Sequence, residues 1–394
     1  MKRYWKILLL SIITLVVIGS FYIQASLAAK NTVQLKLEKR SGNEEELKGL
    51  SIHGDYGSGN LTQSFVHEAD GETRILSGLS LIEEFTTSYT VPVIDKLIEE
   101  HRSFMRGKDL SPNYFFENES LVVYAGVKRD YKYNSIDFSF DIDVLDKKSN
   151  EVKSIPLDLS DTETYGWYDV IDVGVVDGQL KLITRSSLVI GGEEVNVYTF
   201  DIEKEKLLGT EKLISTITKD NSWTELSIIS NSSSIEQEKY ILFTTEILKD
   251  IEKDGNYVQE ATGHEVQVYN IETNQLKKID VRDELFNSIY WSTIVDSKLY
   301  ISTPMEKGIE VIQYDIETDK WGEKSIIDLP KYKNGYESIY TTLMNGKIYA
   351  SYLTDDGHEL YIGDLRTGKS LYEGKIKVSN NPNKTEALYI HYIE

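Results

Sequence analysis

The chain has 394 residues, a formal net charge of −21 at pH 7, six prolines and no cysteine. Its length allows a sizeable core, and 40% hydrophobic with 27% charged residues is typical of a globular protein. The lack of cysteine excludes disulfides, thiolate metal sites, catalytic thiols and lipid-modified cysteines. The acidic balance argues against nucleic acid as a partner, because phosphate backbones bind clustered Lys and Arg.

Residues 1–29 carry the pattern of an export signal. An apolar run covers residues 7–23, and three cations precede it, namely Lys2, Arg3 and Lys6. This run is long for a signal peptide and short for a membrane-spanning helix. Ser26 and Ala28 are small residues at the spacing a signal peptidase prefers and would allow cleavage before Ala29, so a cleaved signal peptide and an uncleaved membrane anchor both stay open. Either alternative places residues 30–394 outside the cytoplasm as one domain.

Two short patterns recur along residues 30–394. The first is a two-residue turn between alternating apolar runs, a hairpin signal that needs positive φ. Its copies cover residues 176–182, 295–301 and 344–350, with a looser copy at 116–123. The second is a strand that ends in Asp or Asn and a polar turn, at residues 140–146, 198–203, 269–272, 314–317 and 361–366. Together they predict four strands in each repeat of about 45–50 residues.

The repeats divide the chain into five complete units and two remnants. The units cover residues 112–158, 165–214, 222–282, 286–328 and 336–378. The strand at residues 385–393 has no successor, and residues 33–85 hold about three strands. We expect the late strand to pair with these early ones in a sixth sheet, because this would hide free strand edges.

These repeats resemble those of β-propeller proteins, of the kelch or PQQ-repeat-like kind in a broad sense. The resemblance implies an all-β fold, a six-bladed β-propeller, with seven blades as the alternative if residues 33–110 contain further strands. A pair of β-sandwiches would not repeat at this period. The cysteine-free composition is similar to that of exported Gram-positive proteins. Such a resemblance implies a fold and leaves the function open.

Two insertions interrupt the repeats. Residues 86–111 predict one short amphipathic helix that begins at Pro92 and is capped by Gly107. Its apolar face would consist of Ile94, Leu97, Ile98, His101, Phe104 and Met105. The second insertion, residues 247–263, separates the second and third strands of the unit at 222–282. In a propeller both insertions emerge on the same rim.

We predict a binding site at this rim, because binding residues are commonly carried by loops on a rigid scaffold. Rigid aromatic rings would supply contact area, and the helix cations would contact anions or carboxylates. The candidate residues are His101, Arg102, Arg106, Arg129, Tyr131, Tyr133, Tyr165, Trp167, Tyr332, Tyr336 and His358.

Sequence motifs point to no catalytic residue and to no cofactor. The six histidines lack the i, i+2 or i, i+4 spacing of metal ligands. Asp250, Glu252 and Asp254 resemble half of a calcium loop, but Ala261 replaces the bidentate glutamate at its end. A polar hairpin tip is the favoured interpretation, and calcium is the alternative.

The sequence thus favours an extracytoplasmic binding or docking protein of the cell envelope. Its partner would be an envelope protein, a peptide or a glycan, and an uncleaved N-terminal helix would add contact with the membrane and a role in sensing envelope state. The alternative is a hydrolase or lyase whose carboxylates or histidines converge at the channel mouth.

Overall fold

The computed structural model describes most of the chain beyond residue 32. The described residues are 5, 9, 13–16, 18–20, 33–58, 61–68, 71–76, 91–132, 136–159, 164–217, 222–229, 234–253, 255–330, 339–379 and 388–394. The chain divides into two compact units. Unit 1 comprises Met1–Thr87, Ser302–Val311 and Lys324–Glu394, and unit 2 comprises Ser88–Ile301 and Ile312–Glu323.

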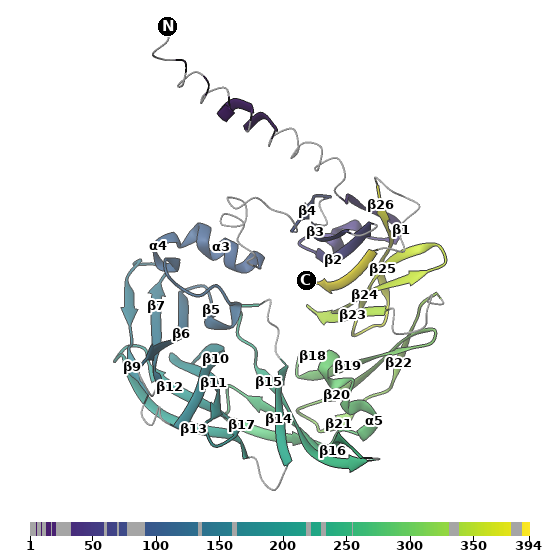
Figure 1. Ribbon diagram of the computed structural model, residues 1–394. Coiled ribbons are helices and arrows are strands. Elements are labelled where there is room, and N and C mark those ends of the chain that lie inside the picture. The colour runs from purple at the N-terminus through teal and green to yellow at the C-terminus, as the bar shows by residue number, and fades with distance from the viewer. Residues whose placement is uncertain are drawn as a thin grey trace. The chain divides into compact units, whose positions relative to one another are not determined.

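Antiparallel sheets follow one another along the chain, so the expectation of an all-β fold is confirmed (Figure 1). The first sheet contains β5 (Phe115–Glu117), β6 (Leu121–Tyr131), β7 (Ile136–Asp146) and β8 (Val152–Ser154), and β9 (Leu157–Asp158) also pairs with β7. The second contains β10 (Tyr165–Val176), β11 (Gln179–Leu188), β12 (Gly192–Asp201) and β13 (Lys206–Ile217). The third contains β14 (Ser222–Ile229), β15 (Tyr240–Lys253), β16 (Asn256–Asn270) and β17 (Gln275–Ile279). The fourth contains β18 (Ser292–Val295), β19 (Lys298–Met305), β20 (Gly308–Asp315) and β21 (Lys320–Trp321), with β22 (Ser325–Asp328) also on β20.

Two further sheets lie in unit 1. One contains β23 (Ile339–Met344), β24 (Lys347–Thr354), β25 (Gly357–Asp364) and β26 (Ser370–Val378), and β1 (Leu35–Gly42) pairs with β26 as its fifth strand. The other has the order β27 (Leu388–Ile393), β2 (Ser51–Ser58), β3 (Leu61–Glu68) and β4 (Thr73–Ile75). The predicted pairing of the late strand with early strands is therefore confirmed, and β1 alone joins the preceding sheet, where Leu35 and Leu37 oppose Val378 and Ile376.

Each of the five predicted repeat units forms one of these sheets, and the turn chemistry explains why. Asp177 and Gly178 have φ of 50° and 76°, and Asn345 and Gly346 have 52° and 71°. These positive values match two-residue hairpins, whose turn twist agrees with that of the strands. The second recurring pattern caps the turn after the third strand, because its Asp or Asn accepts a backbone N–H two or three residues later. The five capping residues are Asp146, Asp201, Asn270, Asp315 and Asp364.

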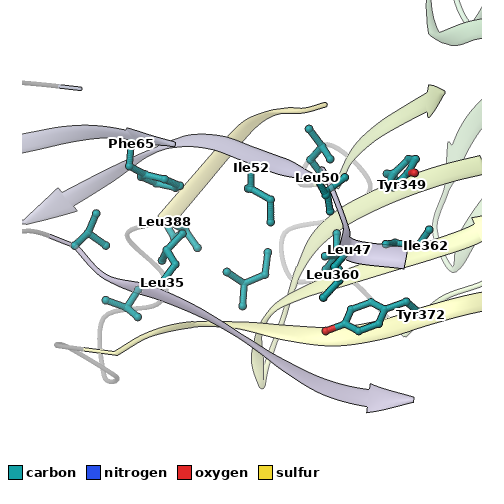
Figure 2. Close-up of a cluster of buried hydrophobic side chains, with 14 of the residues drawn as sticks. Leu35, Leu47, Leu50, Ile52, Phe65, Tyr349, Leu360, Ile362, Tyr372 and Leu388 are labelled. Atoms are coloured by element: carbon teal, nitrogen blue, oxygen red, sulfur yellow. The ribbon is translucent and has the colours of Figure 1, made fainter. Parts of the chain in front are cut away.

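Apolar side chains fill the space between consecutive sheets of unit 2. Phe138 and Phe140 of β7 contact Tyr168 of β10, with ring centroids 6.0 and 6.1 Å apart. Ile183 of β11 and Phe243 of β15 share the next cluster. In unit 1 a separate cluster joins its two sheets, and Figure 2 shows its buried members between the strands. They include Leu35, Ile52, Phe65, Tyr372 and Leu388.

The inserted helix differs from the prediction, because it is broken at His101. α3 (Pro92–Glu100) and α4 (Arg102–Met105) meet at this residue, whose φ of −129° and ψ of 45° are not helical. The predicted apolar face is nevertheless buried, since Ile94, Leu97, Phe104 and Met105 pack on the β5–β8 sheet, with Ile98 half-buried at the edge of the same cluster. The predicted Gly107 stop is confirmed by its φ of 79° after α4.

In the N-terminal segment, the described residues Trp5, Leu9, 13–16 and 18–20 are helical. Within the part of the chain that is described, no helix is both long enough and apolar enough to cross a membrane.

The pairing of β27 with β2 predicts an asymmetry between two adjacent residues. Leu388 is buried in the unit 1 core, whereas Tyr389 is 61% exposed on the other face of β27. We expect Leu388→Ala to lower the free energy of unfolding by about 2–5 kcal/mol, because it leaves a cavity. Tyr389→Ala is the control and should change it by less than about 0.5 kcal/mol. Equal effects in urea unfolding would contradict the structure.

Candidate functional site

The structure separates the predicted rim residues into two groups at opposite ends of the β5–β8 sheet. His101 lies beside Glu117, which opposes Val122 at the start of β6. Arg129 and Tyr131 lie at the far end of β6, about 23 to 30 Å along the strand at the usual rise per residue. The expectation that the helix and these residues share one rim is therefore wrong. The helix packs toward the turn between β5 and β6, because its apolar face joins Phe115 and Leu145 in one cluster.

Arg129 lies near the first residues of β10, and Tyr131 is two residues further along β6, so their binding role stays a prediction. All of them are strand residues, whereas the sequence suggested loops. Arg129 Nη2 donates to the carbonyl oxygen of Tyr168 at 3.2 Å. Tyr131 and Trp167 are exposed. This end of the sheets thus offers two exposed rings beside a guanidinium that is already engaged.

Tyr165 belongs to a structural network instead of an open surface. Its hydroxyl donates to Glu194 Oε2 at 3.2 Å, and its ring packs edge-on against Tyr168 at 5.3 Å. Lys212 Nζ lies 2.5 Å from the other oxygen of Glu194, which is buried. Burial and the neighbouring Tyr198 hydroxyl raise the pKa of Tyr168 far above its usual range. These contacts fix the β10–β13 sheet.

The six other predicted binding residues are either corrected by the structure or stay predictions. His358 is buried in strand β25 of unit 1, where desolvation lowers its pKa to about 4, so it is not a surface binding residue. Arg102 and Arg106 are exposed around α4. Tyr133, Tyr332 and Tyr336 lie outside the described residues.

The calcium candidate lies on an extended hairpin. Asp250 and Glu252 belong to β15 and oppose Gln259 and Tyr257 of β16, so a regular strand ladder replaces the first half of a calcium loop. Gly255 has a φ of 79° at the turn, as expected of a hairpin tip. Asp254 lies outside the described residues.

A hollow at the base of this hairpin is the stronger candidate site. β17 pairs with β16 only from Val266 onward, so the edge of β16 before that residue has no strand beside it among the described residues. A hollow of about 620 Å³, here called the β17-side hollow, lies beside this edge. It is lined by residues of β15, β16, β17 and α5 (Asp283–Phe286). The lining side chains that could contact a ligand through a charge or a ring are those of Glu246, His264, Glu265, Lys278, Asp283 and Phe286.

Contacts within the β17-side hollow orient these groups. The His264 ring stacks on Phe286 with centroids 4.1 Å apart, and His264 Nε2 lies 3.5 Å from Asp283 Oδ1. Lys278 Nζ donates to Glu265 Oε1 at 2.6 Å. The Asp283 side chain is almost fully exposed, so its carboxylate can contact a ligand in place of His264.

A second hollow of about 630 Å³, the β13-side hollow, lies on the opposite face of the same strands. Thr245 and Ile247 line it, whereas the intervening Glu246 lines the β17-side hollow, and successive strand residues point to opposite faces. Both hollows contain Gly263, His264 and Glu265. A bulge places Thr262 opposite Ile247 and Leu248, and its hydroxyl donates to the Ile247 carbonyl at 3.2 Å. This bulge sets which face each of these residues reaches.

Sequence reasoning missed His264 and its neighbours. The only signal was that His264 follows the insertion at 247–263 directly, while Asp283 and Phe286 lie in the next connection. Their meeting depends on the β15–β16 register and on the bulge, neither of which the sequence pattern reveals.

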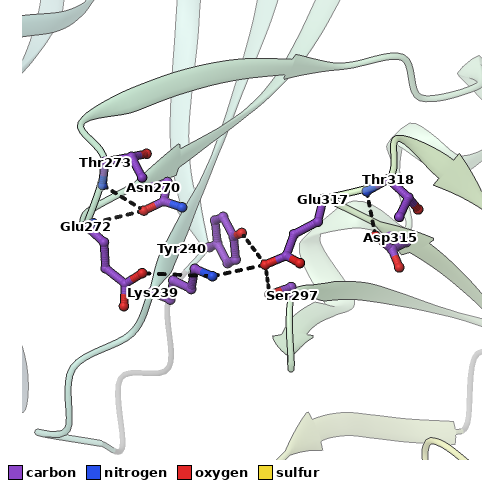
Figure 3. Close-up of polar contacts among 9 residues, drawn as sticks. All are labelled: Lys239, Tyr240, Asn270, Glu272, Thr273, Ser297, Asp315, Glu317 and Thr318. Carbon is purple, nitrogen blue, oxygen red and sulfur yellow. Dashed lines mark hydrogen bonds and ion pairs between the residues drawn. The ribbon is translucent and has the colours of Figure 1, made fainter.

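The other end of the same sheet holds a polar cluster whose groups satisfy one another (Figure 3). Lys239 Nζ lies 3.0 Å from Glu317 Oε1 and 3.9 Å from Glu272. The Ser297 hydroxyl donates to Glu317 at 3.0 Å. The hydrogen bond to Glu317 raises the pKa of Lys239. The cluster joins turns of consecutive sheets, and we assign it a structural role.

Asp172 is a half-buried residue at an irregularity in β10. The register shifts between Val170 and Asp172, and Asp172 Oδ2 is buried without a hydrogen-bond partner. Burial, with a smaller effect of the Glu238 carboxylate, raises the pKa of Asp172 to about 7. A carboxyl group with this pKa exchanges its proton near neutral pH.

No family model matches the chain, and no curated protein matches it. Solved structures with a likeness include TolB from Acinetobacter baumannii, at 11% identity and a TM-score of 0.29, over 83% of this chain and 63% of TolB. The protein lmo1340 from Listeria monocytogenes EGD-e is 11% identical over 69% of each chain, with a TM-score of 0.36. A prolyl endopeptidase is 11% identical over 88% of this chain and 49% of its own, with a TM-score of 0.30. At TM-scores this low, these likenesses carry no weight for fold or function.

Asp172 makes stability depend on pH. Its pKa of about 7 lies above the roughly 3.9 of an unfolded aspartate. The folded state therefore binds the proton more tightly, and this contribution to stability is full below about pH 4 and lost as pH rises through 7. We expect Asp172→Asn to be more stable than the wild type at pH 8 and to show a smaller change in the free energy of unfolding between pH 5 and 8.

Urea unfolding at both pH values measures this change. Asp158→Asn is the control, because Asp158 is exposed in β9. An unchanged pH dependence in Asp172→Asn would contradict the assignment.

Proposed function

We propose that the protein is an extracytoplasmic β-propeller binding protein of the cell envelope. It recognises a partner protein, peptide or glycan at the two hollows that flank β16. The six sheets formed by the described strands and the pairing of β27 with β2 support six blades. The cations and apolar run of residues 1–29 support export, as a secreted or membrane-anchored protein.

The observation that carries the binding role is the pair of hollows beneath the β15–β16 hairpin. Binding sites are concave, with a few polar groups placed on a largely preformed surface. Both hollows share Gly263, His264 and Glu265, so a ligand can contact the same strand from either face. The exposed hairpin residues Tyr257 and Val258 would extend the contact area beyond the hollows.

Charge favours a partner with amino or guanidinium groups. The β17-side hollow contains the four carboxylates of Glu246, Glu265, Asp280 and Asp283, whereas its one ammonium group, Lys278, is bound to Glu265. A chain of net charge −21 adds a long-range field of the same sign. This differs from the anion contact that the sequence suggested for the helix.

An array of basic peptides, neutral peptides and cell-wall glycans tests the proposal. We expect the full chain to retain basic peptides or amino-group-bearing glycans, with affinity that falls as salt rises from 50 to 300 mM. The double variant Glu246→Gln, Asp283→Asn should weaken retention at least tenfold, because two carboxylates leave the hollow.

Glu203→Gln is the matched control, since Glu203 is exposed in the turn after β12 of the same unit. The control should bind as the wild type does. Retention that is equal in the double variant, or that is confined to anionic ligands, would refute this site.

A hydrolase or lyase is the second candidate, and Asp172 is the observation that favours it. A carboxyl group with a pKa of about 7 can donate and accept a proton at neutral pH. Mass spectrometry of the array ligands after incubation separates the two functions. Ligands that the wild type cleaves and Asp172→Asn leaves intact would favour the enzyme. Ligands that stay intact with the wild type would favour binding alone.

A further inference from the structure

The break between α3 and α4 brings three potential metal ligands together. Glu100 ends α3, His101 forms the break, and Glu117 ends β5. One ligand atom from each side chain, an imidazole nitrogen and two carboxylate oxygens, lies within 4.8 Å of the others. Ligand atoms around a divalent ion at about 2.0–2.2 Å are roughly 3–4 Å apart, so small side-chain rotations are sufficient.

Packing holds His101 and Glu117 in place, and both are half-buried, whereas Glu100 is exposed. His101 Nε2 is buried without a hydrogen-bond partner, so the ring has a coordinating atom that no protein group uses. Leu97 of α3 and Phe115 of β5 belong to one buried cluster, which ties the helix to the strand. Glu117 N donates to the Ile235 carbonyl at 3.0 Å, which fixes the backbone of the third ligand. Ligands on rigid, packed elements bind metals with little reorganisation.

Local charge favours a cation between these ligands. Two carboxylates contribute negative charge, and the carbonyl end of α3 adds partial negative charge. Lys147 Nζ lies 2.5 Å from Glu117 Oε1, and Arg102 follows His101 directly. The ammonium binds one oxygen of Glu117 and adds positive charge beside the ligands, so Lys147 competes with a metal and lowers its affinity.

We propose that Glu100, His101 and Glu117 form a binding site for a divalent transition metal of the zinc class. One imidazole nitrogen with two carboxylate oxygens suits Zn²⁺, whereas Ca²⁺ and Mg²⁺ prefer oxygen ligands alone. Three protein ligands leave a coordination position for water or a ligand group. The site lies at the other end of the β5–β8 sheet from Arg129 and Tyr131, and it is independent of the proposed hollows.

Titration of the untagged, chelator-treated full chain with ZnCl₂ against a chromophoric competitor tests the site. We expect one Zn²⁺ per chain and a rise in Tm with added Zn²⁺, because an ion that binds only the folded state stabilises it. His101→Phe keeps a ring in place and removes the nitrogens, and Glu117→Gln removes a charge. Each should lower the affinity at least tenfold and abolish the Tm rise. Lys147→Met should strengthen binding severalfold, because it removes the ammonium group that competes with the metal for Glu117.

His391→Phe is the control, since His391 Nε2 pairs with Asp55 Oδ2 at 3.0 Å on the surface of unit 1. It should bind Zn²⁺ as the wild type does. Folding of each variant is checked by its Tm without metal. If His101→Phe does not fold, the affinity of Glu117→Gln for Zn²⁺ tests the proposal. A wild type that binds no Zn²⁺, or binding that is equal in Glu117→Gln, would overturn the proposal.

Discussion

Aromatic and branched side chains fill the space between consecutive sheets of unit 2, and the rest of that unit depends on this packing. Tyr168 illustrates the constraint, since it contacts Phe138 and Phe140 of the preceding sheet and bonds Tyr198 of its own. A sheet with both faces covered cannot shift its register by one residue, because its apolar side chains would turn to the wrong face. Each strand position is therefore fixed relative to the neighbouring sheet.

Both candidate sites occur where the chain departs from this repeating pattern. The β15–β16 hairpin continues beyond its partner strand β17, and the bulge at Thr262 redirects its residues. The α3–α4 insertion covers the β5–β8 sheet and places His101 against Glu117. The regular sheets supply rigidity, and the departures supply unpaired or exposed polar groups. This division is usual for proteins whose function lies in segments grafted on a scaffold.

Much of the fold could be predicted because its signals are local. Asp177-Gly178 and Asn345-Gly346 each demand a particular turn, and the Asp and Asn caps mark the next one. The candidate site could not be predicted, because it depends on register. One extra residue at Thr262 decides which side chains meet, and His101 lies 16 positions from the Glu117 that it approaches. The predicted rim failed for a related reason, since periodicity cannot reveal that His101 leaves the helical conformation and that the helix packs toward the β5–β6 turn.

The pairing of β27 with β2 has a consequence for the order of folding. Most strand pairs of unit 2 join residues close in sequence, so these sheets can form as soon as their own segment has left the ribosome. The β27–β2–β3–β4 sheet joins segments that are more than 300 residues apart, as the bond between His53 and Glu394 shows. Until residues 388–393 emerge, β2 presents an open edge that invites wrong pairing. β2 therefore gains its partner β27 only after more than 300 further residues have been synthesised, and we expect assembly of unit 1 to be the slowest step in folding.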